Sequence, residues 1–387
     1  MIRASSRLRL ALVTDTFAPE VNGVAMTLGR LVDGMRLRGH DVTVVRPRRP
    51  EDPAPERPWD ATIDENEIVL PSLPLPKYPE VRLAWPWASS WRRVLARRAP
   101  DRVHVATETA LGHIALGWAR DRGIPVTTSW HTRFDAYVGR YGAAGLTQFA
   151  LAWLTRFHRR ARSTLVPTAS LARGLAAYHL PGLAVLGRGV DTVLFDPRKR
   201  SPDERAAWGM GATDVVALGV GRLAPEKDWD DAAEAVARAR AQGVPATLVL
   251  VGDGPDRARL AGLPHVHLTG VRRGEDLARA YASADLFLFP SRTETFGNVL
   301  QEAMASGLPA VAVGRGAARE VLVDGVHGWR VDTEEREPWR QAAVAALHVA
   351  PDQRVHRGRA ARAAMLDRSW DAIVDTFEAH LHEIGGS

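Results

Sequence analysis

The sequence predicts an α/β protein with two doubly wound, parallel-sheet domains in tandem. Apolar, β-branched runs of strand length alternate with helical periodicity along the whole chain, the order expected for parallel strands covered by helices. This alternation starts again after a stretch rich in proline and charge at about 191–204. A length of 387 residues with 45% hydrophobic content is enough for two such domains with large cores.

In the first half, the opening apolar run leads into a helix from Gly23 to Arg38 that Gly39 ends. A second helix is expected over 108–123. The expected strands are RLRLALVT (7–14), DVTVVRP (41–47), RVHVAT (102–107), PVTTSWH (125–131) and STLVPT (163–168). A proline-rich segment, 47–80, is expected to interrupt this domain as a mobile loop.

In the second half, a helix is expected over 229–241, ended by Gly243. The expected strands are VVALGVG (215–221), ATLVLVGDG (246–254), HVHLTG (265–270), DLFLFPS (285–291), PAVAVG (309–314) and WRV (329–331). We therefore expect one domain over 1–195 and a second over 196–368. The amphipathic segment in 369–387 is expected to form a terminal helix that packs back on the first domain.

Composition excludes several classes of protein. The chain has no cysteine, so disulfides, thiol nucleophiles and cysteine metal sites are ruled out. No apolar run is long enough for a membrane-spanning helix, and the start of the chain runs into a strand without a signal-peptide cleavage site. We expect a cytoplasmic protein, with peripheral attachment to the inner face of the cell membrane as a further expectation.

The net charge of +6 comes almost entirely from arginine, and two segments mix arginine with tryptophan: Trp85–Arg98 and Trp153–Arg162. Both could be interfacial helices, with tryptophan at the headgroup level of an anionic membrane. Ordinary surface helices with solvated arginines are the equally weighted alternative. No nucleic-acid partner is expected, because the basic residues lie on separate helices and no known binding motif is present.

Ligands of open α/β sheets bind beyond the carboxyl ends of the strands, so the turns there are the candidate sites. GVGRLAPEKDW (219–229) supplies Arg222 and Lys227, a guanidinium fork and a point charge suited to a diphosphate. A solvated pair with Glu226 is the alternative. VGDGPD (251–256) leaves room for a flat base beside Gly252 and Gly254, although Asp-Gly-Pro is also a common turn.

The turn RTETFGNVLQEAMASGLP (292–309) raises a question of charge. A strand, a glycine turn and a helix start present free N–H groups to an anion, yet Glu294 and Glu302 would repel one. A ligand that carries both phosphates and hydroxyls resolves the conflict, because the carboxylates can accept hydrogen bonds from the hydroxyls.

Together, GRLAPEKD, VGDGP and the E-x7-E spacing of ETFGNVLQE resemble the donor-binding domain of glycosyltransferase family 4, whose members are retaining enzymes. LVTDTFAPEVNGVAMT and GRGVDTVLFDP extend the resemblance over nearly the whole chain. The resemblance implies a GT-B fold, with two Rossmann-like domains facing a central cleft. It also implies that Glu294 holds hydroxyls of the transferred sugar and that Glu302 holds the ribose.

The same resemblance implies a donor site around the diphosphate, which would lie on the N–H groups of the α-helix start opposite Arg222 and Lys227. Its donor-binding residues would be Gly252, Asp253, Gly254, Phe296, Gly297, Asn298, Val299 and Glu302. In the first domain, Asn22 and Gly23 lie where the family typically has a glycine pair near the donor phosphate.

His131 matches the family's active-site histidine, which contacts the transferred sugar. With Arg222, Lys227 and Glu294 it completes the expected catalytic set. Asp15 and Asp135 are acidic candidates for the acceptor side, with helix caps or surface pairs as the alternative.

We predict no metal and no cofactor beyond the nucleotide-sugar donor. Asp228-Trp229-Asp230 has the Asp-x-Asp form of metal-dependent glycosyltransferases, but it begins a helix, where aspartate is favoured as a cap. The pairs His265/His267 and His380/His382 lack a nearby third ligand in the sequence.

The expected function is retaining transfer of a hexose, with mannose from GDP-mannose as the named candidate, to a lipid or lipid-linked acceptor. The branch that glycosylates lipids is the one that WHTRFDAYVGRYG (130–142) and PSLPLPKYPEVRLAWP (71–86) resemble. Two alternatives stay open: the same chemistry on a soluble sugar or polysaccharide, and a catalytically silent GT-B module that binds glycans or membranes.

Overall fold

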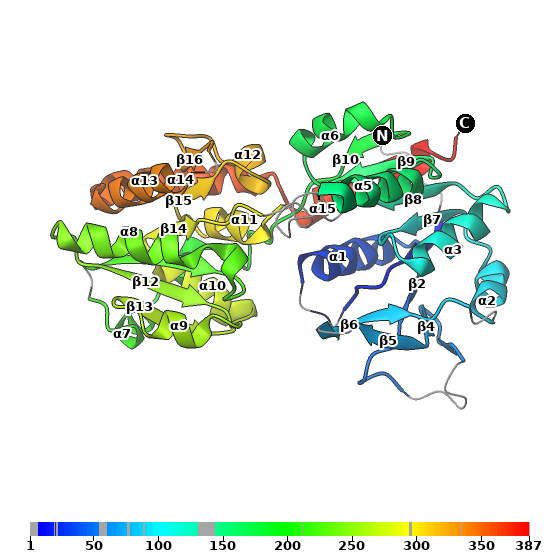
Figure 1. Cartoon of the computed structure of the whole chain (residues 1–387), viewed down its shortest axis with the longest axis horizontal. Helices are drawn as coiled ribbons and strands as arrows, with labels where there is room; N and C mark the ends of the chain where they lie inside the picture. The colour runs from blue at the N-terminus through cyan, green and yellow to red at the C-terminus, as the bar shows by residue number, and fades with distance from the viewer. Residues whose placement is uncertain are drawn as a thin grey trace. The chain divides into compact units, whose positions relative to one another are not determined.

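A computed structural model describes residues 7–18, 20, 22–53, 60–75, 78–87, 90–130, 144–211, 213–293, 296–333 and 335–386. The chain divides into two compact units (Figure 1). Unit 1 contains Met1–Arg188 together with Trp370–Ser387, and unit 2 contains Gly189–Ser369. The division therefore follows Arg188 rather than residue 195.

The described part of unit 1 contains an eight-stranded sheet of order β10-β9-β8-β7-β1-β2-β4-β3, parallel except for the pair β3–β4. Its strands are β1 (Arg9–Val13), β2 (Asp41–Pro47), β3 (Thr62–Ile63), β4 (Glu67–Leu70), β7 (Arg102–Val105), β8 (Val126–Ser129), β9 (Ser163–Val166) and β10 (Leu183–Val185). The five strands expected from the first half are confirmed, because continuous apolar runs are typical of strands buried on both faces.

Helices cover both faces of this sheet. The residues of α1 (Gly23–Leu37) and α15 (Trp370–Glu383) share one core cluster, and those of α2 (Ser90–Arg98), α3 (Ala110–Arg120) and the end of α5 (Ala144–His158) share another. The smaller α6 (Ala169–Leu175) lies beside β9 and β10. α15 packs closely on α1, since a Cβ added at Gly34 would lie 2.5 Å from Cγ2 of Val374.

The expectation of one loop over 47–80 is wrong for its described part. β4 extends the main sheet beside β2, with Ile68 and Leu70 fully buried. β5 (Ser72–Leu75) and β6 (Tyr78–Ala84) form a separate antiparallel pair. The proline-rich composition concealed the run EIVL, whose three apolar residues after Glu67 are enough for a short strand between β2 and β3.

The described part of unit 2 contains a six-stranded parallel sheet of order β13-β12-β11-β14-β15-β16. Its strands are β11 (Val215–Val220), β12 (Ala246–Val251), β13 (Val266–Gly270), β14 (Leu286–Phe289), β15 (Ala310–Val313) and β16 (Gly328–Val331). All six strands expected from the second half are present, and the two doubly wound sheets confirm the predicted fold class.

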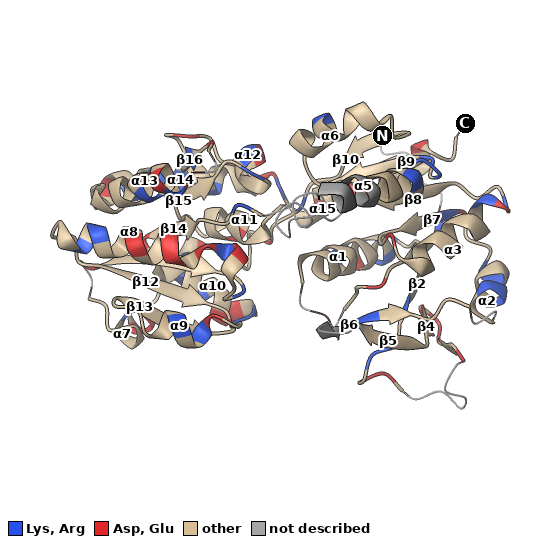
Figure 2. Ribbon diagram, in the orientation of Figure 1, with Lys and Arg blue, Asp and Glu red and all other residues tan. Residues whose placement is uncertain are grey.

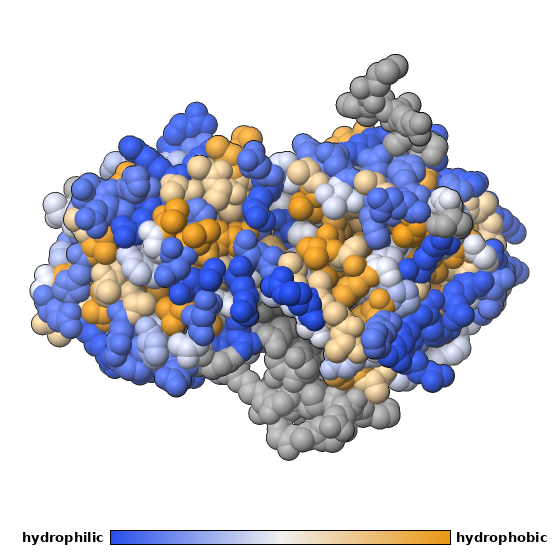
Figure 3. Space-filling view, turned by 90° about the horizontal axis from the view of Figure 1, so that it is seen from above, coloured by the Kyte–Doolittle hydropathy of each residue, from blue (hydrophilic) through white to orange (hydrophobic). Residues whose placement is uncertain are grey.

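The helices of unit 2 also form two layers. One face of the sheet is covered by α8 (Trp229–Ala241) and α13 (Arg336–His348), and the other by α10 (Gly274–Ser283), α11 (Asn298–Ala305) and α14 (Pro351–Leu366). The shorter helices are α7 (Pro202–Ala207), α9 (Arg257–Ala261) and α12 (Ala317–Val321). Apolar residues fill the space between the layers, while the exterior seen in Figure 3 is mostly hydrophilic with smaller apolar groups.

Each sheet has a point where the strand order reverses, which we call its switch point. In unit 1 it lies between β1 and β7, and in unit 2 between β11 and β14. The chain leaves the neighbouring strands toward opposite faces there, which opens a crevice at their carboxyl ends. The loops after β11 and β14 are the ones that carry Arg222, Lys227 and the start of α11.

Candidate active site

The loop after β11 brings two cations to the switch point of unit 2. Lys227 ends a short 3-10 turn (Pro225–Lys227), and a Cβ added at Gly221 would lie 3.9 Å from its Cε, so the lysine stem runs beside the end of β11. The side chain of Arg222 is exposed, and the Arg222 carbonyl accepts a 2.9 Å hydrogen bond from Nε1 of Trp229. Backbone contacts thus hold this loop at the end of β11, with the Lys227 stem beside the strand end and the Arg222 side chain exposed.

The loop after β14 is hydrogen-bonded to the loop after β11. The carbonyl of Glu226 accepts from Oγ of Ser291 at 3.4 Å and from Oγ1 of Thr293 at 3.3 Å. Glu294, the predicted sugar-binding residue, follows directly and lies outside the described residues. The two loops therefore form one connected structure up to the position before Glu294.

Buried ion pairs anchor the same loops to the helices behind them. Asp228 and Asp231 are almost fully buried, and both carboxylates pair with Arg292, at 3.1 and 2.9 Å. Asp228 also pairs with Arg336 at 2.8 Å, and Asp231 with Arg340 at 2.6 Å. Two carboxylates against three guanidinium groups give a compensated buried cluster beneath the switch point.

The capping interpretation of Asp228 is wrong. Asp228 precedes α8 with a left-handed backbone (φ 53°), and its side chain makes no cap hydrogen bond. That backbone geometry turns its carboxylate toward Arg292 and Arg336 instead of the first turn of α8. The Asp-x-Asp string therefore begins with a residue that holds the β14 loop in place.

The glycines after β12 have a packing role. A Cβ added at Gly252 would lie 1.9 Å from the Gly221 carbonyl oxygen, and one at Gly254 would lie 2.3 Å from that of Leu223. Leu223 also donates its N–H to the carbonyl of Asp253 at 2.9 Å. Close contact between the loops after β11 and β12 thus requires both glycines, independently of any base that binds there.

α11 begins at the switch point with an N-terminus that no side chain of the described residues caps. Gly297 precedes it with φ 90°, a left-handed conformation that favours glycine, and the first helical residues are Asn298 and Val299. The N–H groups of a first helical turn have no partner within the helix and carry the positive end of its dipole. Phe296, just before, is buried, and its carbonyl accepts from the N–H of Ala317 at 2.6 Å.

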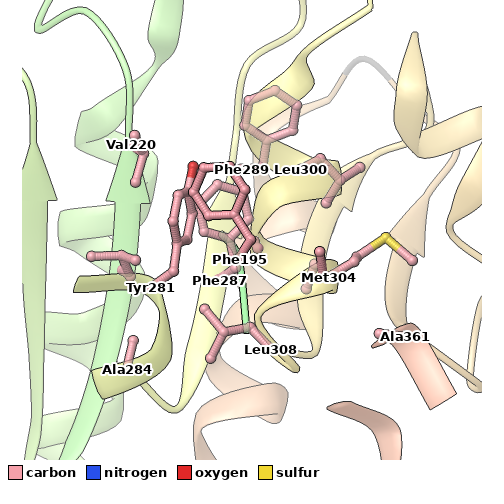
Figure 4. Close-up of a cluster of buried hydrophobic side chains, with 14 of the residues drawn as sticks. Phe195, Val220, Tyr281, Ala284, Phe287, Phe289, Leu300, Met304, Leu308 and Ala361 are labelled. Atoms are coloured by element: carbon pink, nitrogen blue, oxygen red, sulfur yellow. The ribbon is translucent and has the colours of Figure 1, made fainter. Parts of the chain in front are cut away.

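Glu302 lies on the second turn of α11 and is held by Tyr281 of α10. The Tyr281 hydroxyl donates a 2.9 Å hydrogen bond to Oε2 of Glu302. Burial raises the pKa of Glu302 to about 7, and the hydrogen bond from Tyr281 opposes part of that increase. Figure 4 shows the Tyr281 ring beside Phe195 and Phe287 in the apolar cluster that supports α11.

At the switch point of unit 1, the polar groups are bonded to one another. Asp15 is buried, and its carboxylate accepts hydrogen bonds from the Ala84 N–H at 2.8 Å, from the Thr107 hydroxyl at 3.3 Å and from the Thr109 hydroxyl. Burial raises the pKa of Asp15 above its usual range, although all three hydrogen bonds oppose this. The carboxylate thus joins the loops after β1 and β7 to the end of β6.

Asn22 caps the helix that Gly23 begins. Its side-chain oxygen accepts from the N–H groups of Val24 at 3.0 Å and Ala25 at 2.8 Å. Its amide donates to Thr16 at 2.8 Å and to Glu20 at 3.0 Å. The first N–H groups of α1 therefore have a partner within unit 1.

Comparison with known proteins decides the family. The model of "Glycosyltransferase Family 4" matches residues 21–194, and that of "Glycosyl transferases group 1" matches residues 214–348. A GDP-mannose-dependent alpha-mannosyltransferase of Mycolicibacterium smegmatis is 36% identical over 381 residues, 98% of each chain. The chain belongs to glycosyltransferase family 4.

More distant relatives extend the comparison. A GDP-mannose-dependent alpha-(1-6)-phosphatidylinositol dimannoside mannosyltransferase of Mycobacterium tuberculosis is 30% identical over 325 residues, 81% of this chain and 82% of that protein. The solved structure of sucrose-phosphate synthase from Thermosynechococcus elongatus superposes with a TM-score of 0.76 at 19% identity, covering 98% of this chain and 99% of that one. The fold of this family 4 glycosyltransferase is GT-B.

The structure brings together most predicted donor-site residues of unit 2, on the loops after β11, β12 and β14. His131 and Asp135 lie outside the described residues, as Glu294 does. Sequence reasoning missed Tyr281 and the arginines Arg292, Arg336 and Arg340 of the buried cluster. Their partners lie far away in the sequence, and no local pattern marks them.

The two Trp/Arg segments of this glycosyltransferase lie in one helical layer of unit 1, with α3 between them (Figure 2). Trp85, Trp87 and Trp153 are 40%, 59% and 49% exposed. Trp91 was expected at a headgroup level, which is wrong: it is fully buried and donates to the Pro86 carbonyl at 2.9 Å. A groove of about 480 Å³ that includes Arg92 and Arg93 separates α2 from α3.

Among the described residues of this family 4 glycosyltransferase, no helix combines the length and the apolar character that crossing a membrane requires. No group of three or more His, Asp or Glu side chains in that part of the chain could hold a metal ion.

Proposed function

We propose that this glycosyltransferase transfers mannose from GDP-mannose to a lipid or lipid-linked acceptor, with retention of configuration at the anomeric carbon. The switch point between β11 and β14 is the observation that carries the proposal. There the loop that carries Arg222 and Lys227 is hydrogen-bonded to the loop that leads into α11, whose N-terminus no described side chain caps, and Glu302 follows one turn later. Cations and N–H groups suit a diphosphate, and a carboxylate suits the ribose hydroxyls.

The proposed chemistry needs stabilisation of the leaving group. As the bond from the anomeric carbon to the diphosphate oxygen breaks, negative charge grows on the diphosphate, which Arg222, Lys227 and the N–H groups of Asn298 and Val299 would stabilise. The acceptor hydroxyl would attack from the face that the diphosphate leaves. Its proton would pass to a diphosphate oxygen, so neither a protein nucleophile nor a metal is required.

Glu294 and His131 would contact the transferred sugar, as the sequence predicts. Asp135 stays a candidate for the acceptor side. Asp15 is a weaker candidate, because its carboxylate already accepts hydrogen bonds from three groups of its own unit.

The printed names of the relatives support the choice of substrates. The relative that is 36% identical is named for GDP-mannose, and the one that is 30% identical is also named for a phosphatidylinositol dimannoside. The layer of α2, α3 and α5, with exposed Trp87 and Trp153, supports peripheral attachment to an anionic membrane at the inner face of the cell membrane. A lipid acceptor would then be reached from its own membrane.

The testing experiment has two steps. The first is a thermal-shift titration with GDP-mannose, UDP-glucose, UDP-galactose, GDP and UDP without added metal, because a ligand that binds only the native state raises the Tm. We expect shifts with GDP and GDP-mannose only. The second is transfer from GDP-mannose to diacylglycerol-based glycolipids in vesicles, with the anomeric configuration of the product read by NMR.

Different results would contradict different parts of the proposal. Shifts with UDP and UDP-sugars alone would overturn the donor assignment. Transfer to free sugars but not to lipids would favour the soluble-acceptor alternative, and an inverted product would exclude retention. Nucleotide binding without transfer to any acceptor would favour the silent module.

A further inference from the structure

A second basic groove lies on the same helical layer, between α3 and α5. It encloses about 940 Å³ and is lined by four arginines: Arg120 from α3 and Arg156, Arg159 and Arg160 from the end of α5 and the residues after it. The groove lies within unit 1 and does not include the switch-point loops. Nothing in the donor chemistry uses it.

The arginines of this groove are not neutralised by neighbouring carboxylates. Within the described chain, Arg120, Arg156 and Arg160 form no ion pair, and Arg159 donates to the Tyr178 carbonyl at 2.8 Å. Burial, followed by the charges of Arg120 and Arg156, lowers the pKa of the Arg160 guanidinium, and Asp121 opposes this only in part.

The buried arginine cluster of unit 2 shows the contrast. There Arg292, Arg336 and Arg340 share the carboxylates of Asp228 and Asp231. In the α3–α5 groove, the like charges repel one another and no carboxylate of the described residues bridges them. An anion that bound between them would relieve that repulsion, so the groove favours an anionic ligand.

An exposed tryptophan that follows the groove residue Ala152 on α5 indicates where the anion comes from. Trp153 lies one turn before Arg156 on α5, is 49% exposed, and packs against His113 of α3 with ring centroids 4.6 Å apart. An indole with an apolar body and one N–H donor is typical of the level at which lipid headgroups meet acyl chains. Arginine forks match phosphate oxygens with paired hydrogen bonds.

We infer that the α3–α5 groove binds the phosphate of an anionic phospholipid headgroup. This rests on the proposed membrane attachment and deepens it: the layer would recognise phosphate at one site and not merely adsorb to negative charge. The lipid would be held by Arg120, Arg156 and Arg160, with Trp153 in the headgroup region.

The test compares two kinds of anionic vesicle. One contains phosphatidylcholine with phosphatidylglycerol, whose charge is a phosphate, and the other contains phosphatidylcholine with oleate, whose charge is a carboxylate, adjusted to the same zeta potential. Co-sedimentation of the full chain measures the partition coefficient on each. The groove variant is Arg156→Ala/Arg160→Ala, the same-layer control is Arg92→Ala/Arg93→Ala, and an off-layer control is Arg173→Ala/Arg359→Ala.

We expect the unmodified chain to prefer phosphatidylglycerol vesicles by about tenfold and the groove variant to lose this preference. The groove variant should bind those vesicles about 25-fold more weakly, from roughly fivefold for each arginine near an anionic surface. The same-layer control should weaken binding to both vesicles equally and keep the preference. The off-layer control should change neither partition coefficient by more than about twofold.

Three outcomes would overturn the inference. Equal binding of the unmodified chain to both vesicles means diffuse adsorption, and a groove variant that keeps the preference means that the phosphate binds elsewhere. Competition by soluble glycerol phosphate at equal concentration would assign the groove to a free phosphate compound. Absence of all vesicle binding would overturn the proposed membrane attachment as well. Thermal shifts with nucleotides test the donor site separately and show whether each variant is folded.

Discussion

The two switch points of this glycosyltransferase have the same topology but different hydrogen bonding. In unit 1, the Asp15 carboxylate is bonded to three groups from two other segments, and Asn22 caps the start of α1. In unit 2, among the described residues, no side chain caps α11 and the Arg222 guanidinium has no partner. Polar groups that are already satisfied stabilise a fold, whereas unsatisfied ones at a strand end can bind a ligand.

Under the proposed function, this comparison predicts a structural role for the switch point of unit 1 and a donor-binding role for that of unit 2. Substitutions in unit 1 should therefore change the free energy of unfolding more than the donor affinity. Substitutions in unit 2 should do the reverse. Each prediction below tests one side of that contrast.

The largest expected effect is on turnover, from Lys227→Ala. Loss of a preorganised cation beside the leaving diphosphate should lower kcat/KM by about 100- to 1000-fold, while the Tm without ligand stays within about 2 °C. Lys199→Ala is the matched control, because Lys199 forms a surface ion pair with Glu275 at 2.7 Å. Steady-state kinetics with GDP-mannose would measure kcat/KM for both variants. If Lys227→Ala lowered kcat/KM no more than Lys199→Ala does, the donor-site assignment would be wrong.

The next effect is on stability, from Asp15→Ala. Removing the carboxylate leaves the Ala84 N–H and the hydroxyls of Thr107 and Thr109 with fewer partners in a buried place. We expect a loss of about 3 kcal/mol in the free energy of unfolding of unit 1, or roughly 5–10 °C in Tm, with the nucleotide Kd unchanged.

Asp15→Asn separates structure from catalysis at that position. It keeps the shape and most of the hydrogen bonds, so it should retain most of the Tm and most of the transfer rate. A variant with the Tm of the unmodified chain but with transfer reduced more than about tenfold would return Asp15 to the acceptor side of the reaction.

The contrast also explains which features the sequence could predict. Arg222 and Lys227 were predictable, because the strand before them is a continuous apolar run and the rule for α/β sheets locates the ligand at its end. The hydrogen bonds of Asp15 were not, because Ala84 and Thr109 lie 69 and 94 residues away in the sequence. Such pairings depend on which strands become neighbours, and turn motifs carry no information on that.

The same limit applies within unit 2. Glu302 was predicted from the resemblance of its E-x7-E motif to the family, but Tyr281, 21 residues before it, becomes its partner only because α10 and α11 lie on one face of the sheet. β4 was missed for a different reason. Its three apolar residues lie in a proline-rich segment, and composition outweighed so short a run.

A smaller effect is expected from pH, through Glu302. Burial raises its pKa to about 7, so the carboxyl is mostly protonated below that pH. The ribose hydroxyls donate to the ionised carboxylate. Nucleotide binding below about pH 7 therefore requires Glu302 to lose its proton. Acidification from about pH 8 to about pH 6 should weaken GDP binding about tenfold. Calorimetric titration over that range measures the change.

Glu302→Gln is the control, because it keeps the shape and removes the titration. Its GDP affinity should be lower and flat with pH. The free energy of unfolding of the ligand-free chain should change with pH in the opposite sense. Because the pKa of Glu302 is raised in the folded state, its contribution to stability is complete below about pH 4.5. That contribution is lost as the pH rises through about 7. A pH-dependent affinity that persists in Glu302→Gln would assign the titration to another group.

The smallest effect is expected at Asn22, and it tests whether the unit 1 switch point is closed to the donor. Asn22→Ala removes the cap on Val24 and Ala25 and should cost about 1 kcal/mol of unfolding free energy, whereas Asn22→Gly should cost only a few tenths. Chemical denaturation measures both, and the GDP Kd should stay within about twofold in each. If Asn22→Gly instead tightened GDP binding, the nucleotide would bind the N–H groups at the start of α1 that the Asn22 side chain otherwise caps. Both switch points would then contribute to nucleotide binding.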